Sequence, residues 1–462
     1  GSSNASTSME ATIYHFDVNS NNFSEVLDIF SQFFKNPLFS IDSTSREIQA
    51  VDAEDAKNRQ LDNRRILQIL KCLVDPSHPY KKFSTGNIQT LAKGDLEKYS
   101  LEVREVMKSF YQKYYFTRTM GLALAGPQSI EELENYAIKY FSDIIHSRTT
   151  DFDTINDDCN PFTVGQVIYV NPVRDVNQFN ILWIFPSTRK IYRNDPCRFI
   201  GFLLGHEGEG SIFNYLQTQG WATSLSAGTK TSFRDFSLFQ ISISLTPEGL
   251  NKKREIADII HSYVNLVKQM SDDDMRKYWE EIRTCDEVSF LYQMKGSARD
   301  KVVTVADNTL RCLPEHVLSY YHIYDENLDP TLIRKFLSRI NPNNEIWFVI
   351  TKDLNWISST DVPLSNGESP YFSENAQFGE SANRREPWYG VHYYQEKIPD
   401  RLPIEIPNSL FLPTPNNFIP TYLLDPNYQK RVGSNNNPNP NSFYYNPPTK
   451  LYSSSSENDN NN

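Results

Sequence analysis

The sequence contains few cysteines and no closely spaced cysteine pair. Its 462 residues include five cysteines, at positions 72, 159, 197, 285 and 312, and no CxxC motif. A disulfide framework or a zinc ribbon needs cysteines at close, regular spacings, so this scatter argues against both. Isolated reduced thiols are typical of a cytoplasmic protein, and we expect that location.

Long apolar runs and an excess of basic residues are also missing. No apolar run reaches the length of a membrane-spanning helix. The 57 acidic residues outnumber the 46 basic ones, which gives a formal net charge of −11. A nucleic acid or an anionic membrane is therefore disfavoured as a partner. A hydrophobic content of 39% nevertheless supports well-packed cores.

The histidines lack the spacing of a helical zinc motif. They lie at positions 15, 78, 146, 206, 261, 316, 322 and 392, and no two are four residues apart. Neither HExxH nor HxxEH, which place two histidine ligands on one helix face, therefore occurs. The segment 312–316, Cys-Leu-Pro-Glu-His, resembles HxxEH with cysteine first. Pro314 would disrupt a helix there, so we interpret this segment as a structural turn.

Two carboxylates in a long polar pattern are the strongest candidate for half of a metal site. Glu47 and Glu54 lie seven residues apart in a stretch that predicts one helix over about residues 44–72. Because seven residues are about two helical turns, both side chains share a face. From Asp52 to Arg65 the pattern is mostly polar all round, which is typical of a solvated helix or of one that lines a polar cavity.

Each carboxylate also has an ordinary interpretation. Thr44-x-x-Glu47 matches a capping box, in which Glu47 does no more than cap the start of a helix. An isolated Glu54 is most often a solvated charge. A catalytic zinc takes three protein ligands, commonly histidines and one carboxylate. The residue pattern alone leaves the choice open.

Strand and helix patterns follow one another in two successive units. Residues 12–18 alternate like a strand, a helix follows from about Ser24, and an apolar strand is expected at 120–125. The second unit begins with strands at 167–171 and 179–185 and closes with one at 345–352. We expect a partial first domain at residues 1–150, a second domain at 163–425 with an insert at about 355–385, and a disordered Asn/Ser/Pro-rich tail at 430–462.

Several short segments, in order, resemble the insulin-degrading-enzyme (insulysin/pitrilysin) branch of the inverzincin zinc metallopeptidases. They are residues 1–5, 47–54, 83–87, 205–211, 220–221, 388–390, 412–414 and 418–421. The resemblance spans about residues 1–425. It implies an α+β fold of two similar insulinase-type domains, each a mostly antiparallel sheet packed on helices. It also implies a zinc endopeptidase that hydrolyses small peptides in a chamber enclosed by two half-shells.

The resemblance assigns metal-site roles to the two glutamates. In that family HxxEH supplies two histidine ligands and a glutamate general base. The third zinc ligand is a glutamate on the next long helix, and by motif this residue is Glu54. Glu47 matches a second carboxylate that supports the ligand shell.

Substrate-binding roles follow in the same way. By motif, Asn4 and Ala5 form a sheet edge that pairs with extended substrate through main-chain hydrogen bonds. Gly205 and Glu207, with the segment that contains Leu225 and Ala227, resemble the family's exosite, which binds the amino terminus of the substrate. A carboxylate beside an edge strand suits a peptide ammonium group.

The chain departs from the family by lacking both HxxEH and the family's C-terminal half, so we expect a fragment. One glutamate cannot hold a catalytic zinc, and no general base remains to activate water. We therefore expect no catalytic residue here, and a chain that alone is neither stably zinc-loaded nor proteolytic. The expected partners are peptide substrates and the rest of the same enzyme or a homologous subunit. The alternative is a non-catalytic homologue that binds peptides or partners.

Overall fold

The computed structural model describes residues 1–145, 156–353, 381–399 and 407–425. Contacts group Gly1–Asn416 as one compact unit and Asn417–Asn462 as another. The described part of the second unit contains a short 3-10 helix, Thr421–Leu424. The tail expected at 430–462, and the insert expected at 355–385 up to residue 380, lie outside the described residues. The domain boundaries near residues 150 and 163 stay a prediction.

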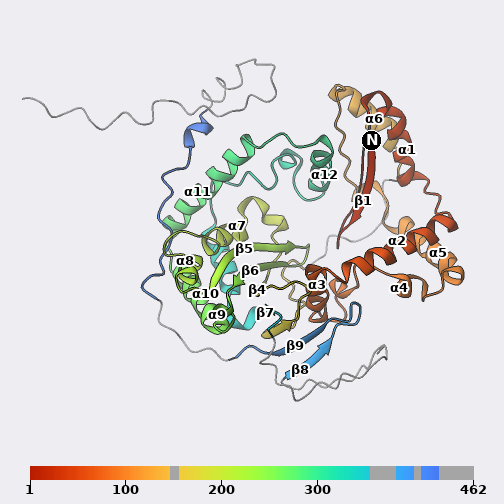
Figure 1. The fold of residues 1–462 in the computed structure, drawn as a ribbon. Coiled ribbons are helices and arrows are strands. Elements are labelled where there is room, and N and C mark those ends of the chain that lie inside the picture. Colours follow the sequence, from red (N-terminus) through yellow and green to blue (C-terminus); the bar gives the residue numbers. More distant parts are fainter. Residues whose placement is uncertain (146–155, 354–380, 400–406, 426–462) are drawn as a thin grey trace, which may run out of the picture. The chain divides into compact units, whose positions relative to one another are not determined.

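A seven-stranded sheet organises the larger part of the first unit (Figure 1). Its strand order is β5-β6-β4-β7-β3-β9-β8, and among the described strands only β3 and β7 pair in parallel. The strands are β3 Gln166–Val170, β4 Gln178–Phe185, β5 Ala222–Ser232, β6 Ser237–Leu245, β7 Glu345–Ile350, β8 Ser381–Arg385 and β9 His392–Lys397. The strands expected at 167–171, 179–185 and 345–352 are confirmed, as is the α+β class with a mostly antiparallel sheet.

Both faces of this sheet are buried. Along β4, Phe179, Ile181 and Trp183 belong to one core cluster, and Leu182 and Ile184 belong to the other. Since successive side chains of a strand point to opposite faces, burial on both sides explains the apolar run at 181–185 of this central strand.

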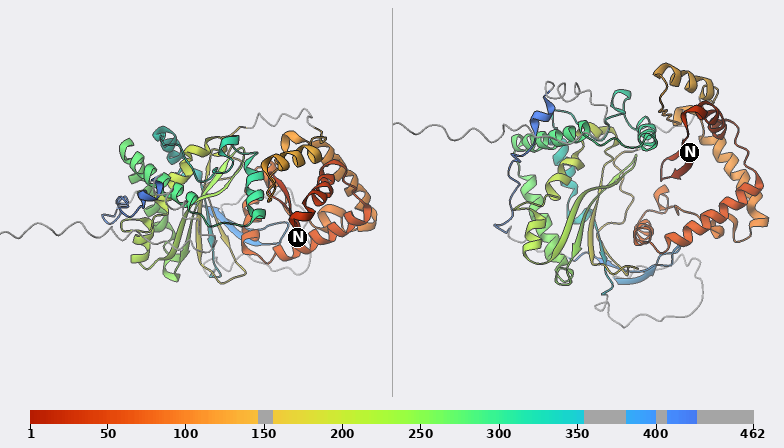
Figure 2. Two further views of the ribbon diagram at one scale, coloured as in Figure 1. Left: turned by 90° about the horizontal axis from the view of Figure 1, so that it is seen from above. Right: turned by 45° about the horizontal axis from the view of Figure 1, so that its top comes forward.

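Helices from the second half of the unit cover one face, as Figure 2 shows. They are α7 Pro196–Leu204, α8 Ile212–Thr218, α9 Pro247–Leu250, α10 Lys253–Lys268, α11 Asp272–Leu291 and α13 Pro330–Arg339. On the other face, Ile69 and Leu70 of α3 (Asp62–Cys72) pack with Phe162, Phe236 and Phe348. The N-terminal residues are thus joined to the sheet through α3.

The N-terminal part contains a hairpin and a series of helices. Strand β1, Ser2–Thr7, pairs antiparallel with β2, Thr12–Asp17, and Phe16 of β2 packs on Phe30 of α1 with ring centroids 4.8 Å apart. The helices are α1 Phe23–Lys35, α2 Ile41–Asn58, α3, α4 Ile88–Ala92, α5 Leu96–Tyr114 and α6 Ile130–Phe141; α12, Ala298–Asn308, contacts β2. The strand at 12–18 and the helix from Ser24 are confirmed. The similarity of the two domains stays a prediction, because the described strands here form only a two-stranded sheet.

The prediction of one helix over residues 44–72 was wrong. The chain forms two helices, because Leu61 adopts an extended conformation at φ −103° and ψ 116° and begins a new helix, α3. The carboxylate of Asp62 then accepts hydrogen bonds from the backbone N–H groups of Val173 and Arg174, at 2.7 and 3.0 Å, which fixes the start of α3. A polar stretch without an apolar stripe gave no signal for this break.

Two further local predictions were wrong. Helix α2 begins earlier than the proposed capping box, with Ser40 as N-cap; its hydroxyl accepts from the backbone N–H of Ser43. Thr44 lies inside the helix and donates to the carbonyl of Ser40 at 2.9 Å. Residues 120–125 form no strand, because they have no strand to pair with in the described structure.

Candidate functional site

Glu47 and Glu54 both lie exposed on α2. The buried residues of this helix are Thr44, Ile48 and Asp55, so the two glutamates flank the packed face. Within the described residues, neither carboxylate makes a hydrogen bond or an ion pair. Glu47 is therefore not a helix cap, and both side chains are free to bind a cation or an imidazole N–H. The structure brings no described histidine to them, so their metal role stays a prediction.

The neighbouring acids of α2 do bind other residues, which the sequence did not reveal. Asp55 is buried and accepts from Arg59, at 2.7 and 3.0 Å, and from the side-chain amide of Asn87 at 3.2 Å. Asp52 accepts from the backbone N–H of Ile88 at 2.9 Å, at the start of α4. A buried carboxylate needs such partners. The polar residues Asp52 and Asp55 of α2 therefore serve its packing on α4, and this packing holds the helix that carries Glu47 and Glu54.

A second anchor of α2 comes from the hairpin of β8 and β9. The ring of Phe83 stacks on Trp388, with centroids 4.6 Å apart. The hydroxyls of Thr85 and Tyr389 lie 3.3 Å apart, and the amide of Asn58, the last residue of α2, lies 3.5 Å from Thr85 Oγ1. Two of the quoted motif segments, 83–87 and 388–390, thus meet in space and support the helix that carries Glu54.

Asn4 and Ala5 lie exposed in β1. They pair with His15 and Tyr14 of β2, and β1 has no second strand partner among the described residues. The hairpin is held in place at its turn, where Glu10 forms an ion pair with Arg189. An exposed strand edge can receive an extended peptide through main-chain hydrogen bonds. The geometry is thus compatible with the proposed role of Asn4 and Ala5, which stays a prediction.

Of the proposed exosite residues, Gly205 lies close to Ala227 of the edge strand β5. Strand β5 is an edge of the large sheet, and α7 packs closely against it. A Cβ on Gly205 would lie 3.4 Å from the backbone nitrogen of Ala227, and a Cβ on Gly201 would lie 3.2 Å from its carbonyl oxygen. These glycines allow the close approach of α7. The side chain of Leu225 is buried in the core, so only its backbone can meet a ligand.

Glu207 is exposed on the turn after α7, in acidic surroundings. Burial lowers the pKa of the neighbouring His206, although Glu281 and Glu207 act in the opposite direction. Phe411 donates its backbone N–H to the carbonyl of Gly210 at 3.1 Å, so the quoted motif at 412–414 lies beside this glycine-rich turn. The acidic surroundings favour a cationic ligand group.

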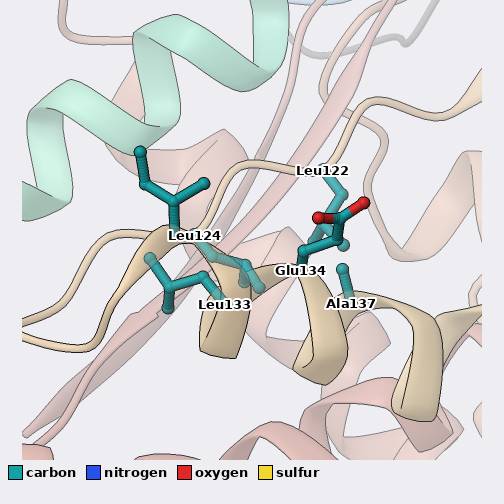
Figure 3. Close-up of a pocket in the computed structure, with 6 residues that line it drawn as sticks. Leu122, Leu124, Leu133, Glu134 and Ala137 are labelled. Carbon is teal, nitrogen blue, oxygen red and sulfur yellow. The ribbon is translucent and has the colours of Figure 1, made fainter.

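Two other features do not contain the predicted site residues. The segment 312–316 is a turn, as expected: residues Pro314–His316 form a 3-10 helix, and His316 Nδ1 lies 2.8 Å from the hydroxyl of Tyr192. An apolar hollow of about 370 Å³ lies between residues 122–124 and α6 (Figure 3). It is lined by Leu122, Leu124, Ile130, Leu133, Glu134 and Ala137.

Comparison with known families decides the relationship of this chain. The family model described as "Insulinase (Peptidase family M16)" matches residues 1–75. The model described as "Peptidase M16 inactive domain" matches residues 102–280, and "Middle or third domain of peptidase_M16" matches residues 290–453. The chain belongs to the M16 peptidase family.

Relatives within the M16 family confirm the insulysin-like branch. The chain is 33% identical over 435 residues to insulin-degrading enzyme-like 1, peroxisomal, of Arabidopsis thaliana, covering 92% of this chain and 41% of that one. It is 30% identical over 427 residues to the human insulin-degrading enzyme, covering 91% and 39%. The chain therefore spans about two fifths of the length of these relatives.

Solved structures support the fold. Pitrilysin superposes with a TM-score of 0.73 at 23% identity, covering 86% of this chain and 39% of that one. A protease from Helicobacter pylori superposes with a TM-score of 0.54 at 15% identity, covering 76% of this chain and 82% of that one.

Among the described residues, no helix combines the length and the apolarity that crossing a membrane requires. The cytoplasmic location stays a prediction.

Proposed function

We propose that this chain is part of an insulysin-like zinc metalloendopeptidase that hydrolyses small peptides inside an enclosed chamber. Glu54 is the third zinc ligand, and Glu47 orients the ligand shell. The observation that carries this proposal is the contrast along α2. Asp52 and Asp55 are engaged by α4, whereas Glu47 and Glu54 share an exposed face with no partner among the described residues.

The carboxylates of Glu47 and Glu54 are of a type that zinc accepts, but they are fewer than the protein ligands that a catalytic zinc site needs. Carboxylate oxygen is an accepted zinc ligand, and a catalytic site combines three protein ligands with water. A bound zinc would polarise the peptide carbonyl and lower the pKa of its water. The 462 residues contain no HxxEH, so the remaining ligands and the general base come from the rest of the same enzyme or from a homologous subunit. The chain alone is therefore inactive.

The substrate is held at two edges in this proposal. Asn4 and Ala5 of the exposed strand β1 pair with the peptide backbone, which tolerates many side-chain sequences. Farther from the metal, the backbone at Leu225 and Ala227 pairs with the amino-terminal end of the peptide. Glu207 then binds the ammonium group through a charge-assisted hydrogen bond. The close approach of Gly205 to Ala227 supports this arrangement, because Glu207 follows Gly205 in the same turn.

The alternative is a non-catalytic homologue that binds peptides or partner subunits. The observation that favours it is the match of residues 102–280 to the family model described as an inactive domain. Both candidates predict peptide binding by the exposed strands. Only the first candidate, the zinc metalloendopeptidase, predicts that zinc binding and peptide hydrolysis depend on Glu54.

Hydrolysis of a fluorogenic peptide separates the two. The complete enzyme, with the HxxEH-bearing part present, should cleave the peptide, and the 462-residue chain alone should bind but not cleave it. Glu54→Gln should abolish cleavage by the complete enzyme, whereas Glu134→Gln, an exposed glutamate on α6, should leave it unchanged. Binding without cleavage in the complete enzyme would favour the alternative, and cleavage that survives Glu54→Gln would contradict the ligand assignment.

A further inference from the structure

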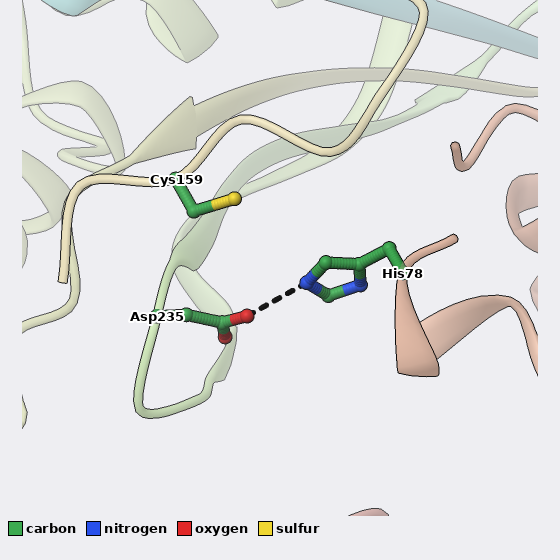
Figure 4. A group of neighbouring side chains, drawn as sticks. All are labelled: His78, Cys159 and Asp235. Carbon is green, nitrogen blue, oxygen red and sulfur yellow. Dashed lines mark hydrogen bonds and ion pairs between the residues drawn. The ribbon is translucent and has the colours of Figure 1, made fainter. Parts of the chain in front are cut away.

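Three side chains with metal-binding atoms meet outside the proposed peptidase site. His78 precedes the 3-10 helix Pro79–Lys81, Cys159 precedes β3, and Asp235 lies in the turn between β5 and β6. One ligand atom from each lies within 4.8 Å of the others (Figure 4). Each side chain is half-buried, so the group is shielded without being closed to an ion. No sequence motif predicts this group, because the three residues are far apart along the chain.

The backbone around this group is already fixed. Cys159 donates its N–H to the carbonyl of Asp235 at 3.0 Å, and Asp75 donates to the carbonyl of Pro161 at 2.8 Å. The ring of His78 packs on Phe236, with centroids 5.9 Å apart. Since the three segments are held together without an ion, metal binding needs little additional ordering.

The charge around the group favours a cation. The carboxylates of Asp235, Asp158 and Asp75 surround the Cys159 thiol. The same carboxylates attract a divalent ion, and a bound ion converts a thiol to the thiolate that ligates it. Sulfur, imidazole nitrogen and carboxylate oxygen are together the donors that zinc accepts, with a fourth position left to water.

We propose that His78, Cys159 and Asp235 form a zinc site that clamps the segment of His78 to the turn between β5 and β6. This site contains neither Glu47 nor Glu54, so it is separate from the proposed peptidase centre. It is an exception to the expectation that the chain alone holds no zinc. Its role is structural, because the ion ties the N-terminal part of the chain to the large sheet.

The competing interpretation is a plain hydrogen bond between His78 and Asp235. His78 Nδ1 accepts from the backbone N–H of Tyr80 at 3.2 Å, so without metal the ring proton lies on Nε2, which donates to Asp235 Oδ2 at 2.7 Å. Zinc at Nε2 would move this proton to Nδ1. Both hydrogen bonds would then be lost, because Nε2 could no longer donate to Asp235 and Nδ1 could no longer accept from Tyr80. Zinc would take their place by binding Nε2 and Oδ2, and the Cys159 thiol would lose its own proton to solvent.

Cobalt(II) titration of the 462-residue chain tests the clamp, because cobalt replaces zinc and its absorption reveals a thiolate ligand. One equivalent should bind with thiolate absorption and be displaced by zinc. Cys159→Ser and His78→Gln should each weaken binding by at least about tenfold. Cys312→Ser, a matched cysteine control, and Glu54→Gln should leave it unchanged. The proposal would be overturned if the bound cobalt showed no thiolate absorption or if Cys159→Ser bound cobalt as tightly as wild type. It would also be overturned if Glu54→Gln lost cobalt binding.

Alkylation of the wild-type chain gives a test that requires no folded variant. Zinc should slow the reaction of Cys159 with iodoacetamide by about tenfold or more, since a metal-bound thiolate is withdrawn from the reagent. Peptide mass spectrometry can follow Cys159 and Cys312 in the same sample, and the rate at Cys312 should not change. Equal rates at Cys159 with and without zinc would contradict the clamp. Neither result bears on Glu54, so the peptidase proposal is tested separately.

Discussion

Phe83 and Trp388 stack nearly parallel, with ring centroids 4.6 Å apart and planes inclined by 13°. This contact joins the segment that precedes α4 to the hairpin of β8 and β9. The same segment binds α2 through Asn87 and Asp55. The hairpin therefore supports the helix that carries Glu54, although it lies far from that helix in the sequence.

Loss of this stack should loosen the anchor of α2. Trp388→Ala should lower the free energy of unfolding by about 2 kcal/mol, because packing area and an aromatic contact are lost together. In a double-mutant cycle with Phe83→Leu, chemical denaturation should give a coupling energy of about 1 kcal/mol. Trp388→Phe retains an aromatic ring and should cost less. Additive effects of Trp388→Ala and Phe83→Leu would show that the stack contributes nothing of its own.

Asp55 should be the acid of α2 that matters most for stability. Asp55→Ala should lower the free energy of unfolding by about 3 kcal/mol, because the buried amide of Asn87 and the guanidinium of Arg59 lose their shared acceptor. Asp42, whose ion pair with Arg46 is exposed on the same helix, is the matched control. Asp42→Asn should leave the denaturation midpoint unchanged. Equal effects of the two variants would contradict the role given to Asp55.

Lys71 should make stability depend on pH in the alkaline range. Burial lowers the pKa of this amine from 10.5 to about 8, although it donates to the carbonyl of Lys82 at 2.6 Å. Between these two pH values the unfolded chain binds the proton and the folded chain does not. The stability that depends on Lys71 is therefore full above pH 10.5 and is lost as the pH falls through about 8.

Thermal unfolding of wild type and Lys71→Met across this pH range checks whether the stability that depends on Lys71 rises with pH. The difference in stability between the two proteins should shift in favour of wild type as the pH rises. Lys98→Met, an exposed lysine in the first turn of α5, is the control and should show no such trend. A constant difference between wild type and Lys71→Met at all pH values would mean that the amine is not perturbed by burial.

Glu207 should select peptides by their amino terminus. Glu207→Gln should weaken the binding of a peptide with a free amino group by roughly tenfold, which corresponds to the loss of one charge-assisted hydrogen bond. The same peptide with an acetylated amino terminus should bind wild type and variant equally, which fluorescence anisotropy can measure. Glu209→Gln provides a control on the same turn. If Glu207→Gln weakened the binding of both peptides equally, Glu207 would not recognise the amino group of the peptide.

The sequence predicted the strongly periodic elements and failed where tertiary partners decide the structure. The strand β4 could be predicted from its apolar run at 181–185, because burial on both faces favours apolar side chains at successive positions. The break between α2 and α3 was not, since the contacts of Asp62 with residues 173 and 174 are long-range. Residues 120–125 looked like a strand but have no strand beside them in the described structure.

For the candidate sites, too, contiguous sequence motifs could be recognised, whereas contacts between distant segments could not. Family motifs predicted roles for Glu47, Glu54 and Glu207, because those motifs are contiguous in sequence, and these roles stay predictions. The motifs gave no sign that Asp52 and Asp55 hold α2 in place. The meeting of His78, Cys159 and Asp235 was equally invisible, since only the folded backbone brings the three together.

The zinc content of the complete enzyme, measured by mass spectrometry after dialysis, reports whether Glu54 binds the metal. Glu54→Gln should lose about one equivalent of zinc per enzyme relative to wild type, because the third ligand of the peptidase centre is removed. Glu134→Gln should retain the wild-type content. A Glu54→Gln enzyme that keeps the zinc content of the wild type would show that Glu54 is not a zinc ligand.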